Sequence, residues 1–101
     1  MSNTHTLEAA LFRLKAGTDE EAFLMASDGT MTALKGYSGF IRREVLKSDD
    51  GQWLDLIYWH SLEEAMSAAE QIISDPTCHP FLEMLDMGSI TMLHLQPVRT
   101  Y

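Results

Sequence analysis

The chain has 101 residues, of which 46% are hydrophobic and 22% are charged, and its formal net charge is −8. This length and composition predict one globular domain over residues 1–101 and argue against disorder. The negative charge argues against binding to nucleic acid or to a membrane surface, because both are negatively charged themselves.

The opening stretch MSNTHTLEAALFRLK lacks the charged and then apolar segments of a leader peptide, and no apolar run is long enough to span a membrane. Cys78 is the only cysteine, which excludes an internal disulfide and agrees with a reducing compartment. We therefore expect a cytoplasmic protein.

Six main elements and one short helix are predicted in chain order. Strands are expected at residues 6–15, 39–47, 52–60 and 89–98. Helices are expected at residues 18–35 and 61–74, followed by a short helix at 76–85. The clearest local signals are Asp50-Gly51, typical of a two-residue hairpin turn, and the capping box formed by Ser61 and Glu64.

The order βαββαβ predicts a ferredoxin-like α+β fold, in which two helices cover one face of a four-stranded antiparallel sheet. Side chains alternate along a strand, so residues 53, 55, 57 and 59 face one side and residues 54, 56, 58 and 60 face the other. Both sets are rich in large apolar groups. We therefore expect a second copy of the sheet to cover the open face, which gives a homodimer.

Three stretches carry a resemblance to a known family: FRLKAGT, GYSGFIRREVLKSDDGQWLDLIYWHSLEEA and DPTCHPFLEML. Together they make the chain similar to the dimeric α/β-barrel superfamily and, within it, to the antibiotic-biosynthesis-monooxygenase-like group. The resemblance implies a homodimeric α/β barrel with a cavity between sheet and helices in each subunit. The group includes quinone-forming monooxygenases, haem-degrading enzymes, isomerases and members with no assigned role.

The resemblance also implies site residues. Oxygenase members have a tryptophan at the end of the third strand, which Trp59 matches, and an asparagine on the first strand, where this sequence has Ala10. Haem-degrading members have a histidine after the second helix, which His79 matches. The departure at Ala10 removes an amide that would hydrogen-bond substrate or oxygen.

Two aromatic residues and a carboxylate are candidates for the cavity. Glu8 and Phe12 share one face of the first strand, where a desolvated carboxylate would have a raised pKa and could accept a proton, unless an ion pair satisfies it. Trp59 could stack on a flat aromatic substrate, or be part of the core.

Two further candidates are charged or titratable. If Asp50-Gly51 is a two-residue turn, Arg42 lies opposite Trp59 and can hold an anionic substrate group; the alternative is an ion pair with Glu44 or Asp55. His79 is a candidate general base or haem ligand, or simply a histidine that faces solvent. The four histidines show no metal-ligand spacing, so we expect no metal site.

The function that we expect is oxidation of an electron-rich aromatic molecule or quinol without a cofactor. The substrate anion itself would reduce oxygen, with Arg42 stabilising the anion and Glu8 or His79 taking the proton. The alternative is a non-catalytic or stress-related homodimer whose cavity holds a small hydrophobic molecule, and haem binding or degradation is a third possibility.

Overall fold

The computed structural model describes residues 5–101; residues 1–4, part of the stretch inspected for a leader, lie outside it. The strands are β1 (Thr6–Phe12), β2 (Phe40–Lys47), β3 (Trp53–Trp59) and β4 (Thr91–Leu95). The helices are α1 (Glu20–Leu34), α2 (Leu62–Ser74) and α3 (His79–Glu83), with 3₁₀ turns η1 (Pro76–Cys78) and η2 (Met87–Ser89). Within the described range, no helix is both long and apolar enough to cross a membrane.

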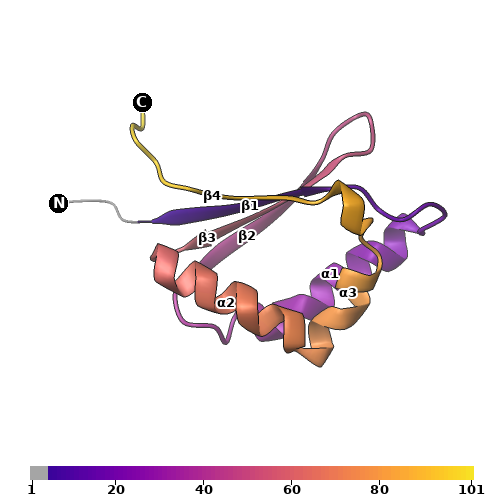
Figure 1. The fold of residues 1–101 in the computed structure, drawn as a ribbon, viewed down its shortest axis with the longest axis horizontal. Helices are drawn as coiled ribbons and strands as arrows, with labels where there is room; N and C mark the ends of the chain where they lie inside the picture. Colours follow the sequence, from indigo (N-terminus) through magenta and orange to yellow (C-terminus); the bar gives the residue numbers. More distant parts are fainter. Residues whose placement is uncertain (1–4) are drawn as a thin grey trace.

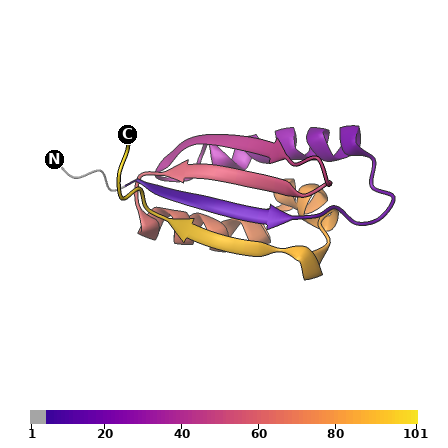
Figure 2. The same ribbon diagram turned by 90° about the horizontal axis from the view of Figure 1, so that it is seen from above.

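The predicted ferredoxin-like α+β fold is confirmed. The four strands form one antiparallel sheet in the order β2-β3-β1-β4. Figure 1 shows α1, α2 and α3 together beneath one face of the sheet. Figure 2 shows the other face with no segment lying over it. The short helix expected at residues 76–85 is divided into η1 and α3, and η2 was not predicted.

The helix starts follow the capping chemistry of the sequence. The Ser61 hydroxyl accepts a hydrogen bond from the backbone N–H of Glu64 at 3.1 Å, which confirms Ser61 as the predicted N-cap. The Glu64 carboxylate accepts from the Ser61 hydroxyl at 3.0 Å. The first helix begins at Glu20 rather than at residue 18, because the carboxylate of Asp19 caps it by accepting from the backbone N–H of Ala22 at 3.0 Å. The hydroxyl of Thr18, which precedes this cap, donates to the carbonyl of Lys15 at 2.7 Å.

The hairpin between β2 and β3 has a longer turn than expected, so the predicted register is wrong by one residue. The backbone N–H of Ser48 donates to the carbonyl of Gln52 at 2.8 Å, and Gly51 has a φ of +88°, a conformation that favours glycine. This is a three-residue loop rather than a two-residue turn. Consequently Arg42 lies opposite Tyr58, and Arg43 lies opposite Ile57.

The core beneath the sheet has two parts, each with one tryptophan of β3. One cluster of buried residues contains Phe12, Phe23, Trp53, Phe81 and Leu85. The other contains Leu34, Ile57, Trp59, Ala65 and Ala68. The alternation expected for β3 is therefore confirmed, because Trp53, Asp55, Ile57 and Trp59 are all buried on the face that carries the helices.

Candidate functional site

A cavity of about 130 Å³ lies between the sheet and the helices. Its walls come from the helix-facing side of all four strands, from the three helices, and from the segment between α3 and β4. Most lining side chains are apolar, but three are charged: Glu8, Arg43 and Asp55. Met92 also lines the cavity and is 48% exposed, so the wall beside β4 borders solvent.

Arg43 and Asp55 form a buried, two-pronged ion pair in the cavity wall. Arg43 Nε donates to Asp55 Oδ1 at 2.8 Å, and Nη2 donates to Oδ2 at 2.9 Å. Nη1 of the same guanidinium donates to Thr30 Oγ1 at 2.7 Å and to the carbonyl of Ser27 at 3.1 Å. Charge-assisted hydrogen bonds of this kind are among the strongest in proteins. The network connects β2 and β3 to α1. Because it joins one cation to one anion, the Arg43–Asp55 pair has no net charge.

Glu8 is a carboxylate held in an apolar environment. It is 3% exposed, and its Oε1 accepts a hydrogen bond from the indole Nε1 of Trp59 at 3.0 Å. Burial raises the pKa of Glu8 above its ordinary value, while the hydrogen bond from Trp59 acts in the opposite direction. The sequence-based expectation of a desolvated carboxylate on this face is confirmed, and the arrangement suits a group that accepts a proton inside the cavity.

His94 is a neighbour of Glu8 that the sequence did not single out. The two residues lie directly opposite each other on β4 and β1, and His94 Nε2 is 3.6 Å from Glu8 Oε2. The strand register supplies this contact, and it cannot be read from the sequence before the order of the strands is known. The sequence placed Asp55 on the correct face but missed its partner Arg43, since only the three-residue loop places Arg43 on the face that carries the helices.

Phe12 and Trp59 occupy different places relative to the cavity. Phe12 lines it, as expected, and packs edge-to-face against Phe23 and Phe81. Trp59 is completely buried in the core and is not part of the lining, so its ring does not face a substrate in this structure. Its link to the site is the hydrogen bond to Glu8.

The placement expected for Arg42 is wrong. The guanidinium lies on the open face of the sheet, 4.0 Å from the centre of the Tyr58 ring, and pairs with Glu44 at 3.6 Å. The physical reason is the single-residue change of register, which moves a side chain to the opposite face of a strand. The arginine that reaches the cavity is Arg43.

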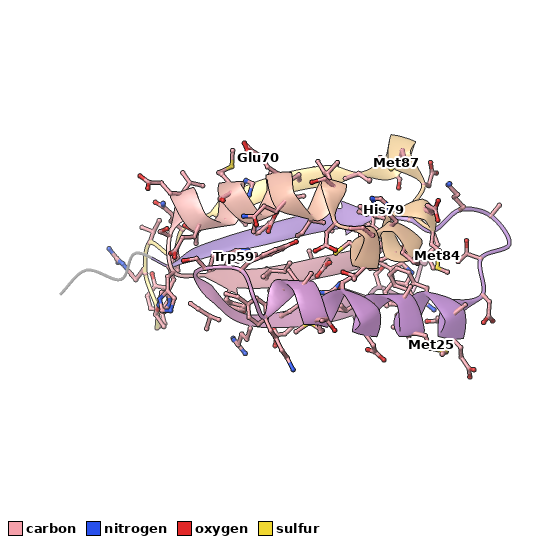
Figure 3. All side chains as sticks on the ribbon, turned by 90° about the horizontal axis from the view of Figure 1, so that it is seen from below. Met25, Trp59, Glu70, His79, Met84 and Met87 are labelled. Carbon is pink, nitrogen blue, oxygen red and sulfur yellow. The ribbon has the colours of Figure 1, made fainter. Side chains whose placement is uncertain are left out.

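His79 also lies outside the cavity, so the structure supports the solvent-facing alternative rather than a general base or haem ligand. The side chain is exposed, and Nε2 is 3.2 Å from the carbonyl oxygen of Ile73. Figure 3 shows His79 at the junction with α3, at a distance along the molecule from Trp59. A haem does not fit these residues, because the candidate ligand points away from a cavity that is smaller than typical cofactor pockets.

Two other features limit the chemistry of the site. Ala10 lines the cavity at the position where the resemblance implies an asparagine. Cys78 also lines it, but burial raises the pKa of the thiol, which disfavours the nucleophilic thiolate. Within residues 5–101, no group of three or more His, Cys, Asp or Glu side chains is placed to hold a metal ion.

Comparisons with known proteins give matches in structure rather than in sequence. No family model matches the chain, and no curated protein matches it. A proposed antibiotic biosynthesis monooxygenase from Bordetella bronchiseptica is 14% identical with a TM-score of 0.80, over 95% of this chain and 99% of the other. SnoaB, a cofactor-independent oxygenase from Streptomyces nogalater, is 16% identical with a TM-score of 0.69, over 96% of each chain.

A third structure, from Nitrosomonas europaea, is also a proposed antibiotic biosynthesis monooxygenase. It is 12% identical with a TM-score of 0.72, over 97% of this chain and 94% of the other. The chain shares the fold of these three structures. This confirms the resemblance seen in the sequence as a likeness of fold, and the chemistry of the chain has to be argued from its own cavity.

Proposed function

We propose that the chain is a cofactor-independent monooxygenase that oxidises a small electron-rich aromatic molecule, such as a phenol or quinol. The observation that carries the proposal is Glu8, a buried carboxylate with a raised pKa in an otherwise largely apolar cavity. The shared fold with an oxygenase supports it. The cavity is close in size to an apolar protein cavity of about 150 Å³ that binds benzene, so it suits a single-ring substrate.

The proposed chemistry begins with proton transfer. The Glu8 carboxylate takes the hydroxyl proton of the substrate, and the electron-rich anion that results reduces oxygen. For a phenol with a free para carbon, the balance is phenol plus O₂ to para-quinone plus water. One oxygen atom enters the ring, and the other takes up two protons and leaves as water. These two protons balance the hydroxyl and para protons that the substrate loses. The four electrons that O₂ gains come from the substrate, so no cofactor is required.

Arg43 takes the role that the sequence suggested for Arg42. Its guanidinium lines the cavity, where a positive group stabilises a phenolate better than it does in water. The two hydrogen bonds to Asp55 fix the guanidinium in place, so the guanidinium need not reorganise when the anion forms. Phe12 and Phe81 supply aromatic surface for the ring of the substrate.

We also propose that two copies associate through the open face of the sheet. Most of the face is apolar, with these residues on the four strands: Leu7, Ala9, Leu11, Leu46, Leu54, Leu56, Tyr58, Leu93 and Leu95. The charged residues that β2 adds to it are Arg42 and Glu44, which form an ion pair with each other. Leu46, Leu93 and Leu95 are each more than 40% exposed in the single chain. Exposed apolar surface of this extent is typical of an interface. A cytoplasmic location is a further proposal, which rests on the lone cysteine.

The test of the function is oxygen uptake with a panel of single-ring phenols and quinols, followed by mass spectrometry of products formed under ¹⁸O₂. We expect one ¹⁸O atom in the quinone formed from a phenol with a free para carbon, and a loss of about 100-fold or more in turnover for Glu8→Gln. Glu70→Gln, which removes an exposed carboxylate on α2, is the matched control. Unchanged turnover in Glu8→Gln would refute the proposed role of the carboxylate.

A second candidate function is a binding protein that performs no reaction. It is favoured by the Arg43–Asp55 pair, whose hydrogen bonds are satisfied within the protein and do not need a reacting group. This candidate predicts that phenols bind, as measured by calorimetry, while oxygen is not consumed. A bound phenol with no product would therefore decide in its favour.

A further inference from the structure

The two oxygen atoms of the Glu8 carboxylate have different surroundings. Oε1 accepts the indole hydrogen bond of Trp59 at 3.0 Å, whereas Oε2 lies 3.6 Å from Nε2 of His94. The second distance is longer than a hydrogen bond. It follows from strand pairing, since residues 8 and 94 lie directly opposite each other in the sheet and share a face.

Nε2 of His94 is an unusual atom, because it is buried and has no hydrogen-bond partner among residues 5–101. The hydroxyl Oγ1 of Thr6 is also buried and also has no hydrogen-bond partner in the described part of the chain. Both residues flank Glu8 on the same face, Thr6 two positions earlier on β1 and His94 across the strand pair. Native proteins satisfy the large majority of buried polar side-chain atoms, so an unpartnered nitrogen beside a buried carboxylate points to a function.

Glu8 cannot exchange a proton with solvent by itself, because it is only 3% exposed. The His94 side chain is 20% exposed and belongs to β4, an edge strand of the sheet. The other titratable neighbour, Asp55 on β3, is held by the two-pronged bond to Arg43.

The helices add no charge to this part of the cavity. The residues of α1 and α2 that line it are Thr30, Leu34 and Ile72, none of which is charged. His94 is therefore the one titratable neighbour of Glu8, among the described residues, that combines a free nitrogen with contact to solvent.

We propose that Glu8 and His94 form a proton relay, in which His94 takes from Glu8 the proton that the carboxylate received from the substrate and releases it to solvent beside β4. The substrate O–H bond breaks as an O–H bond forms on Glu8. That bond then breaks as an N–H bond forms at His94 Nε2, and the imidazolium loses a proton to water. Imidazole suits the second step because it gains and loses protons near neutral pH. The relay rests on the function proposed above, and restores the Glu8 carboxylate for each turnover.

The first test needs no turnover. It follows the carboxyl ¹³C resonance of Glu8 against pH in the wild-type chain and in His94→Gln. A positive imidazole lowers the pKa of Glu8, so we expect this pKa to be higher in the variant. His60→Gln, which replaces an exposed histidine after β3, is the matched control. An unchanged Glu8 titration in His94→Gln would show that the two groups are uncoupled and would overturn the relay.

The second test uses turnover of phenol and separates proton transfer from a structural role. We expect His94→Ala to lower kcat by about 100-fold with little change in KM, and added imidazole to restore part of kcat. His94→Gln keeps most of the volume and should show the same loss of kcat if His94→Ala does not fold. A rise in KM with unchanged kcat, or a loss that imidazole does not restore, would contradict the relay.

The two tests also separate the relay from the proposed function. Normal turnover in His94→Gln together with its loss in Glu8→Gln would overturn the relay and leave the function standing. A wild-type chain that binds phenol and consumes no oxygen would refute the function. In that case the Glu8 titration alone decides whether the two side chains are coupled. An unchanged titration would overturn the proposed pairing of Glu8 with His94.

Discussion

The two faces of the sheet reverse the usual distribution of polar and apolar groups. Beneath the helices, the sheet buries Glu8, Arg43 and Asp55, whereas the uncovered face presents mostly leucine side chains. Arg42 and Arg43 are neighbours in the chain and show the contrast directly. Arg43 is 5% exposed and donates to Asp55, Thr30 and Ser27, while Arg42 is 58% exposed and has one long ion pair.

Each face carries an unfavourable contribution to the free energy of the folded chain, and the two contributions have different causes. Burying charge is costly unless every group is paired, so a protein has reason to keep such groups where a reaction or a ligand needs them. Apolar surface left in water is also unfavourable, by about 25 cal/mol per Å². We therefore infer that the covered face holds the substrate site, and that the open face is a surface that binds a partner.

The largest effect that we expect from breaking this contrast is in Arg43→Met. Removal of the guanidinium leaves the Asp55 carboxylate buried without a partner, which should lower the free energy of unfolding by about 3–5 kcal/mol. Arg42→Met is the matched control and should cost no more than about 1 kcal/mol, because its ion pair is exposed. Urea unfolding followed by tryptophan fluorescence measures both.

The double variant Arg43→Met/Asp55→Leu tests the reason for the loss. Replacing both partners by apolar groups removes the unpaired charge, so most of the lost stability should return. If the double variant is as unstable as Arg43→Met, the loss arises from packing against Phe81, whose ring centre lies 5.3 Å from the guanidinium carbon. Equal costs for Arg43→Met and Arg42→Met would remove the distinction between the two faces.

A charge placed at the middle of the open face should prevent self-association. Leu56 lies opposite Ala9 on β1 and opposite Glu44 on β2, at the centre of the apolar surface. We expect Leu56→Lys to weaken the dimer by about 2 kcal/mol or more, roughly 30-fold in the dissociation constant. Analytical ultracentrifugation gives this constant directly.

The matched control for this prediction lies on the helical side. Met25 is 73% exposed on α1, and Figure 3 shows it on the outer edge of that layer. Met25→Lys adds the same charge without touching the open face, so it should leave the dissociation constant unchanged. A wild-type chain that sediments as a monomer at micromolar concentration would end the proposal that this face is an interface.

The covered and open faces were predictable from the sequence, because alternation along a strand depends only on local pattern. The capping box of Ser61 and Glu64 fixed the start of α2 in the same way. The register was not predictable, since Asp50-Gly51 suits both a two-residue turn and the three-residue loop that the structure has. That single choice decides which of Arg42 and Arg43 reaches the cavity.

The candidate site was predictable only in part, because its key contacts join distant segments. Glu8 and Phe12 could be assigned to the correct face from β1 alone. The hydrogen bond from Trp59 to Glu8 spans 51 positions of the chain, and the contact of Glu8 with His94 depends on β4 pairing with β1. For His79 the sequence left a cavity position and a solvent-facing position open, because the local pattern gave a helix but not the direction of its side chains.

The smallest effect that we expect concerns the cost of burying the Glu8 carboxylate between the sheet and the helices. Since the pKa of Glu8 is raised in the folded chain, its protonated form stabilises the fold at low pH, and this contribution is lost as pH rises through the raised value. Glu8→Gln keeps an oxygen for the Trp59 indole and cannot ionise. The unfolding free energy of the wild-type chain should therefore fall relative to Glu8→Gln as pH rises from about 4. Glu44→Gln, on the open face, is the control. A constant difference between wild type and Glu8→Gln across this pH range would show that burial of Glu8 carries no such cost.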